Sequence, residues 1–185
     1  MLGIRIRPAT VADAAAIAAI HRDARAATMP YLPPQRRTLA EVTRWVAEVV
    51  LRESRVWVAV RPAADGAAAD GAVTDGPAAD GAAADGAEEV IGYAALEGEL
   101  LDKLYLRPDL RRRGVGTLLL DELARHSPGG LTLHVFELNS EARAFYRRHG
   151  FTVVGHGDGS GNMEGLPELT LRREPGRPGA GDAVV

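Results

Sequence analysis

The segment from Leu101 to Leu123 constrains the fold of this 185-residue chain more than any other. It opens with alternating residues that place Leu104 and Leu106 on one face of a strand and Tyr105 on the other. The proline that follows cannot donate to a ladder, so the strand ends before it. Beyond a short turn, apolar residues recur at helical spacing, at Val115, Leu118, Leu119, Leu120 and Leu123. The segment therefore predicts a strand, a turn and a helix in succession.

The turn between this strand and this helix has the composition of an anion site. It reads Arg111-Arg112-Arg113-Gly114-Val115-Gly116 and ends at a helix N-terminus, where unpaired N–H groups point forward. Its two glycines let the backbone approach a phosphate with no side chain in the way. The dinucleotide fingerprint would need a third glycine where Leu119 stands, and the nucleotide P-loop would need a lysine that the turn lacks. A diphosphate loop of another type remains, and an arginine-rich surface turn is the alternative.

Two motifs resemble one family. Arg111-x-x-Gly114-x-Gly116, after a strand and a proline turn, resembles the acyl-CoA diphosphate loop of the GNAT superfamily of N-acetyltransferases, Gln/Arg-x-x-Gly-x-Gly/Ala. A later segment is similar to the family's asparagine, small residue, Phe-Tyr and Gly-Phe, at Asn139, Ala142, Phe145-Tyr146 and Gly150-Phe151. The motifs occur in the family's order at a suitable separation. The resemblance is sharp between residues 101 and 151 and covers residues 5–172 in outline.

The resemblance implies an α/β GNAT fold. Its central mixed sheet would have six to seven strands, with a splay between the fourth and fifth strands and helices on both faces. We expect the domain to span residues 1–173. Residues 63–87 consist of Asp, Gly and Ala except at Val73, Thr74 and Pro77, and the Asp-Gly step that recurs every five residues brings no residue large enough to bury. We therefore expect a disordered loop there, since closing a longer loop costs little, and a disordered tail at 174–185.

Composition narrows the classes of function. The chain has no cysteine, which excludes disulfides and thiolate metal sites, and we expect no metal. The formal net charge is −3, with five acidic residues in the insert, so nothing points to a nucleic-acid partner. No apolar run reaches the roughly 18 residues of a membrane span. A strand pattern begins at Ile4 and leaves no room for a signal peptide. We expect a cytoplasmic protein with no membrane partner, and a homodimer stays open.

The resemblance also implies acetyl-CoA as the acetyl donor. Backbone amides of residues 112–117 would hold the diphosphate, with the arginines at 111–113 adding charge. The pantetheine arm would pair with the strand at 104–106, and the N–H of Leu106 would polarise the thioester carbonyl. The predicted cofactor-binding residues are Leu104, Tyr105, Leu106, Arg111, Arg112, Arg113, Gly114, Val115, Gly116, Thr117 and Asn139.

Two residues are candidates for catalysis. Tyr146 matches the family's general acid, because a phenol can protonate a leaving thiolate while staying neutral itself. The alternative is that Tyr146 only packs beside the cofactor. Strand alternation places Asp102 on the face of Leu104 and Leu106, where it could serve as the general base. Glu97 and Glu99, just across the predicted hairpin, compete for that role, and a structural or substrate-binding function of Asp102 is equally open.

The expected function is transfer of an acetyl group from acetyl-CoA to a primary amine of a small molecule or protein. The alternative is a non-catalytic acyl-CoA sensor or interaction module. Loops at 29–32 and 158–164 and the Asp102 end of the strand would bound the acceptor pocket. Its acidic residues, Asp102, Glu97, Glu99 and Glu164, favour a cationic amine. Two histidines are expected to play no part: His21 at the edge of the first helix's apolar stripe, and His134 within a strand.

Overall fold

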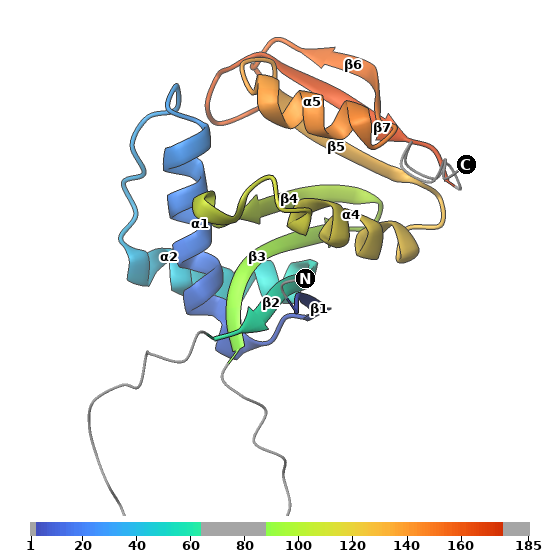
Figure 1. Ribbon diagram of the computed structural model, residues 1–185. Helices are drawn as coiled ribbons and strands as arrows, with labels where there is room; N and C mark the ends of the chain where they lie inside the picture. The colour runs from blue at the N-terminus through green and yellow to red at the C-terminus, as the bar shows by residue number, and fades with distance from the viewer. Residues whose placement is uncertain (1–2, 64–87, 176–185) are drawn as a thin grey trace, which may run out of the picture.

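A computed structural model describes residues 3–63 and 88–175 of the chain. Seven strands form one mixed sheet in the order β1-β2-β3-β4-β5-β7-β6 (Figure 1). Their bounds are β1 Arg5–Pro8, β2 Arg55–Pro62, β3 Glu88–Glu97, β4 Leu100–Leu106, β5 Leu131–Phe136, β6 Thr152–Gly157 and β7 Glu168–Arg173. The mixed sheet of seven strands confirms the expected fold class. The insert from residue 64 to 87 and the tail from residue 176 lie outside the described residues.

Helices cover both faces of the sheet (Figure 1). On one face lie α1 (Ala14–Thr28), α2 (Leu39–Trp45), the π-helical segment η2 (Val46–Val50) and α3 (Leu51–Glu53), and on the other lie α4 (Val115–Arg125) and α5 (Ser140–Arg148). Two 3₁₀ turns, η1 (Val11–Asp13) and η3 (Pro108–Leu110), precede α1 and α4. The π-helical segment η2 joins α2 directly to α3.

Each face has its own hydrophobic core. Ile17, Val42 and Val58 are fully buried between α1, α2 and the sheet. On the opposite face, Leu119 and Leu123 of α4 are fully buried against the strands. The prediction that Leu118 belongs to this buried stripe is wrong, because it is 43% exposed. Five apolar residues in nine positions cover more of the helix circumference than the sheet can reach.

The sheet opens between β4 and β5. These strands run parallel, as expected for strands joined by a helix. They pair only at Leu100 and Thr132, beside a hydrogen bond from the Thr132 N–H to the Glu99 carbonyl (2.9 Å). Beyond that point their ribbons diverge (Figure 1). The expected splay between the fourth and fifth strands is therefore present, and in the described part of the chain the rest of β4 presents an edge without a strand partner on that side.

Candidate active site

The turn between η3 and α4 presents a row of backbone N–H groups. Gly114 caps α4 in the left-handed conformation with φ +83°, and Arg112 also has a positive φ of 61°. In the described residues, no protein oxygen accepts from the N–H groups of residues 112–116. The amide of Thr117, which we expected to join them, instead donates to the Gly114 carbonyl (3.1 Å). Five amide donors at the positive end of the α4 dipole are thus left without a protein acceptor in the described residues, an arrangement suited to phosphate oxygens.

Gly116 contributes close packing rather than turn geometry. A Cβ built on it would lie 3.3 Å from Cζ of Phe145 on α5 and 3.5 Å from a methyl group of Leu106 on β4. That contact with Phe145 is tighter than almost all real Cβ contacts. The glycine therefore lets the first turn of α4 approach both β4 and α5. From the sequence we expected a glycine here only for the close approach of a phosphate.

The arginine side chains of the turn are held by a carboxylate that the sequence did not indicate. Arg111 and Arg112 donate to the two carboxylate oxygens of Glu141, in the first turn of α5, at 2.7 and 2.8 Å. Their guanidinium groups lower the pKa of Glu141 through these hydrogen bonds. Glu141 thereby ties the turn to α5. The pairing was hidden in the sequence because thirty positions separate Arg111 from Glu141.

The open edge of β4 carries donors and acceptors that face the splay. The N–H of Arg107 donates to Ile91 of β3 at 3.0 Å, so this residue's amide points toward β3. Because backbone groups alternate along a strand, the amides of Leu106 and Leu104 point the other way, toward β5. β5 does not pair with β4 there. The Leu106 N–H that we expected to polarise a carbonyl is therefore directed into the splay.

Tyr146 lies on α5, across from this edge. Its ring is 9% exposed and packs edge-on against Phe145 and Phe151, each with ring centroids 5.3 Å away. Among the described residues, its hydroxyl has no hydrogen-bond partner. Burial, and to a lesser extent the phenol of Tyr105, raises the pKa of Tyr146 well above its ordinary value. The phenol is therefore neutral at physiological pH and holds a proton that it can donate.

Asn139 caps α5. Its Oδ1 accepts from the N–H of Ala142 at 3.1 Å, which satisfies one of the free amides at the helix start. Direct contact between Asn139 and a cofactor stays a prediction.

The expected orientation of Asp102 is wrong. β4 contains a bulge, with Leu101 opposite Leu96 and Lys103 opposite Ala95, so Asp102 has no partner on β3. The extra residue breaks the alternation, and Leu101 joins the core cluster on the α4 face that also takes Leu104 and Leu106. Asp102 instead lies close enough to His21 and Tyr105, which pack beneath α1, for its charge to raise the pKa of each. Its carboxylate contacts the ammonium of Lys103. Strand periodicity alone cannot reveal a bulge.

A buried polar group under α1 was also missed by the sequence. His21 is only 8% exposed, and its Nδ1 forms a 2.8 Å hydrogen bond with the Tyr93 hydroxyl. Tyr105 presents its ring to His21 at 4.9 Å, and Trp45 lies 5.5 Å away. Burial, with smaller effects from nearby positive charges, lowers the pKa of His21 to about 4. Tyr105 is partly buried, and the loss of solvent around its phenol raises its pKa to about 12.

Contacts join the two halves of the molecule near this group. Arg25 of α1 pairs with Glu164, in the loop between β6 and β7, at 3.1 Å, and both side chains are largely buried. Tyr31, in the loop after α1, packs edge-on against Phe136 at the end of β5 with centroids 6.2 Å apart. The two loops predicted to bound the acceptor pocket therefore both reach toward the other half.

The acidic residues do not make this region negative, contrary to the basis of our substrate prediction. Asp102 is paired with Lys103 and Glu164 with Arg25. Glu97 accepts from Ser54 at 3.0 Å. Glu99 lies in the β3–β4 turn, 3.9 Å from Arg172 of β7, at the end where β4 and β5 still pair. The four carboxylates thus do not form one acidic pocket, because separate partners hold them.

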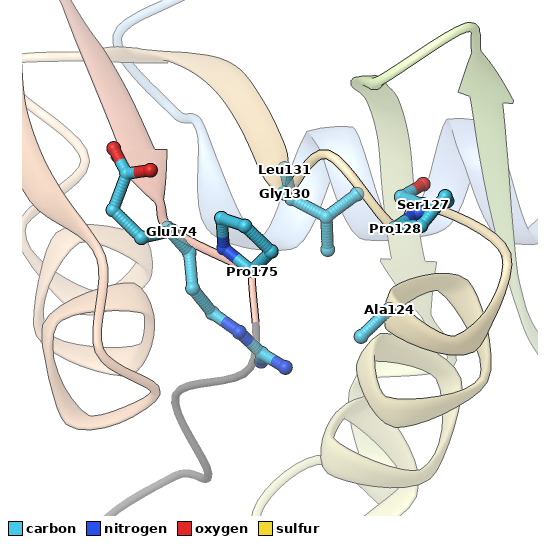
Figure 2. Close-up of a pocket in the computed structure, with 8 residues that line it drawn as sticks. Ala124, Ser127, Pro128, Gly130, Leu131, Glu174 and Pro175 are labelled. Carbon is cyan, nitrogen blue, oxygen red and sulfur yellow. The ribbon is translucent and has the colours of Figure 1, made fainter.

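Several other features lie apart from this site. Figure 2 shows a small pocket at the opposite end of α4 from the glycine turn, lined by Ala124, Ser127, Pro128, Gly130, Leu131, Arg173, Glu174 and Pro175. His134 is exposed on β5 and contacts Thr170 at 3.3 Å, as a strand residue was expected to do.

In residues 3–63 and 88–175, no three histidines or carboxylates are grouped to hold a metal. No helix in those ranges is both long and apolar enough to cross a membrane.

Comparison with known proteins agrees with this geometry. Curated proteins include the peptidyl-lysine N-acetyltransferase YjaB of Salmonella typhimurium, 36% identical over 84 residues, which are 45% of this chain and 57% of that protein. The chain thus matches little more than half the length of this relative. The solution structure of apo YjaB from Escherichia coli superposes with a TM-score of 0.63 and 27% identity, over 91% of this chain and 96% of that one.

A more distant structure shares the fold alone. The PaiA N-acetyltransferase of Thermoplasma acidophilum, solved in complex with coenzyme A, has a TM-score of 0.62 at 17% identity, over 93% of this chain and 99% of that one. Finally, residues 45–153, more than half of the chain, match the family model of the acetyltransferase (GNAT) domain. The chain therefore belongs to the GNAT acetyltransferase family.

Proposed function

We propose that this protein transfers an acetyl group from acetyl-CoA to a primary amine. The observation that carries the proposal is the row of five amides at residues 112–116, which have no acceptor in the described residues and follow the open edge of β4 in the chain. Diphosphate and an extended amide-containing arm are the two parts of coenzyme A that such a surface fits. Membership of the GNAT family supports this assignment, as does the coenzyme A complex of the Thermoplasma relative.

The residues present fit the cofactor in donor type. The amides of residues 112–116 would hold the diphosphate, and Leu104 and Leu106 would pair with the pantetheine arm as a neighbouring strand does. The close packing of Gly116 against Phe145 and Leu106 brings the turn beside both α5 and the open edge of β4. When bound, acetyl-CoA supplies the activated acetyl group, and the Leu106 N–H would stabilise negative charge on its carbonyl oxygen.

Tyr146 would provide the proton for the leaving thiolate. Its burial keeps the phenol protonated, and its hydroxyl would donate to a ligand bound in the splay. The acceptor must reach the site as a neutral amine, so a proton has to leave it directly or through water. Asp102 remains our candidate to receive that proton. Asp102 lies at the bulge of β4, on the same face of the sheet as His21, which is the face that α1 covers.

We propose the side-chain amine of a lysine within a protein or peptide as the acceptor. The YjaB relatives, named as peptidyl-lysine N-acetyltransferases, support this class. The paired charges around Asp102 and Glu164 remove the reason to require a strongly cationic small molecule such as a polyamine. Aromatic groups line the same region, including Trp45 and Tyr105, and they suit the apolar stem of a lysine side chain.

A thiol-release assay tests the function. The full-length chain is incubated with acetyl-CoA and one class of acceptor at a time. The classes are lysine-containing peptides, free amino acids, polyamines and aminoglycosides. We expect release with the peptides, at a rate that saturates with acetyl-CoA. Release only with small amines would keep the acetyltransferase and overturn the acceptor class. Absence of both thiol release and acetyl-CoA binding, measured by calorimetry, would overturn the function itself.

A further inference from the structure

One lysine occurs in the whole chain, against 21 arginines, and it lies on the strand at the centre of the proposed site. Lys103 immediately precedes Leu104, the first residue whose backbone groups face the splay. A lysine differs chemically from an arginine because it can lose its proton and become a nucleophile, whereas a guanidinium stays charged. The single residue of the chain with this reactive amine therefore lies at the proposed site.

The surroundings of the Lys103 ammonium resemble a binding site for a lysine side chain. The side chain is only 16% exposed, although lysines are usually among the most exposed residues. Its Nζ lies 5.3 Å from the centroid of the Trp45 ring and contacts the carboxylate of Asp102. An aromatic face and a carboxylate are the two groups that hold an ammonium. The protein's own lysine thus lies where the proposed acceptor lysine would be expected to bind.

We propose that Lys103 is itself an acceptor, acetylated on Nζ by acetyl-CoA bound to the same chain. This inference rests on the function proposed above. Leu106 lies three residues further along β4, about 10 Å away along the strand, and the flexible four-carbon stem of lysine can extend in that direction once Asp102 releases it.

The chemistry balances with the groups at hand. The Lys103 ammonium loses one proton to Asp102 or water, and the neutral amine attacks the thioester carbonyl carbon. A C–N bond forms and the C–S bond breaks, with the thiolate taking a proton from Tyr146. The second proton leaves the nitrogen as the amide forms and restores the phenol. The products are acetylated Lys103, one free thiol and one released proton.

Acetylation would change the charge of the acceptor region. The modified side chain is neutral, so Asp102 would lose the cation that it contacts in the structure. The carboxylate would then be available to an incoming ammonium, and the aromatic face of Trp45 would be vacated or covered by an acetamide. The modification would therefore adjust which acceptors this site accepts.

Mass spectrometry of the intact, full-length chain after incubation with acetyl-CoA tests the inference. Peptide mapping assigns any added acetyl group, and it separates Lys103 from the N-terminal amine. We expect one acetyl group on Lys103, formed at a rate independent of protein concentration because the reaction is intramolecular. Tyr146→Phe should slow it roughly 100-fold, as loss of a general acid does. Lys103→Arg keeps the charge and should bind acetyl-CoA as the unaltered chain does, without gaining an acetyl group at residue 103.

Two results would overturn the inference. One is an unmodified Lys103, and the other is modification at the same rate in urea-unfolded protein, which would be ordinary chemical acetylation. The same samples are assayed for acetyl-CoA binding and for thiol release with lysine peptides. If these persist while Lys103 stays unmodified, only this inference fails. If they are absent as well, the proposed function fails with it.

Discussion

Gly116 of α4 and Phe145 of α5 lie so close that a Cβ on the glycine would stand 3.3 Å from the phenylalanine ring. This contact fixes the distance between the helix that carries the proposed diphosphate site and the helix that carries Tyr146. A side chain at residue 116 must therefore push these two elements apart or force Phe145 out of its place.

Replacing Gly116 by leucine should abolish acetyl-CoA binding and destabilise the fold by roughly 1–3 kcal/mol, the usual cost of overpacking. Calorimetry gives the affinity and urea denaturation gives the stability. Gly3→Leu is the matched control, because a Cβ at Gly3 meets only Pro62, at 3.9 Å or beyond. Unchanged affinity in Gly116→Leu would remove the α4 turn from the cofactor site.

Replacing Tyr146 by phenylalanine should reduce acetyl transfer by roughly 100-fold and leave acetyl-CoA affinity unchanged. The melting temperature should also stay the same, since the hydroxyl has no hydrogen-bond partner in the described residues. Steady-state kinetics with a lysine peptide and calorimetry provide the two readouts. Kinetics and calorimetry together also distinguish an enzyme from a non-catalytic sensor. A sensor would bind acetyl-CoA, but even the unaltered chain would acetylate no peptide.

Replacing Asp102 by asparagine should lower the rate most strongly below the pKa of the acceptor amine, where a proton has to be removed. Recovery of the rate at high pH would support a function as base, because the amine is then already neutral. A uniform loss at every pH would assign Asp102 to holding Lys103 or the acceptor. The pH–rate profile of the variant, beside that of the unaltered chain, distinguishes these outcomes.

The lowered pKa of His21 leads us to expect that the fold loses stability as the pH falls. Its pKa is about 4 in the folded chain, mainly through burial, with Lys103 and Arg25 lowering it further and Asp102 opposing them. The unfolded chain, with an ordinary pKa near 6.5, therefore binds more protons between pH 6.5 and 4. The free energy of unfolding should fall by roughly 3 kcal/mol across this window. His21→Gln should flatten that slope in urea titrations, whereas His134→Gln, at an exposed residue of β5, should retain it.

Replacing residues 63–87 by Asn-Gly should leave the melting temperature and acetyl-CoA affinity nearly unchanged. Pro62 and Glu88 are direct partners in the β2–β3 pair, so a two-residue turn can connect them. Val73 is the only large aliphatic residue of the replaced segment, so the segment has little apolar surface to add to a core. A large loss of stability would show that the segment packs against the rest of the chain.

The parts of the site that are local in sequence could be predicted, and those formed by distant residues could not. Strand, turn and helix around Gly114 follow from periodicity and from the conformational demands of proline and glycine. The bulge at Asp102 could not be foreseen, since a single extra residue leaves no mark on composition. Glu141 and His21 were likewise missed, because the partners that define them, Arg111 and Tyr93, are remote in the chain.

The opening between β4 and β5 divides one sheet into two that are joined at a single residue pair, Leu100 and Thr132. A ligand that pairs with Leu104 and Leu106 would supply the hydrogen bonds that a continuous sheet makes for itself. Binding of the cofactor would therefore also connect the strands β1–β4 to the strands β5–β7. The angle between β1–β4 and β5–β7, and with it the width offered to the acceptor, would be set only when the cofactor is in place, which gives a physical basis for ordered binding with acetyl-CoA first.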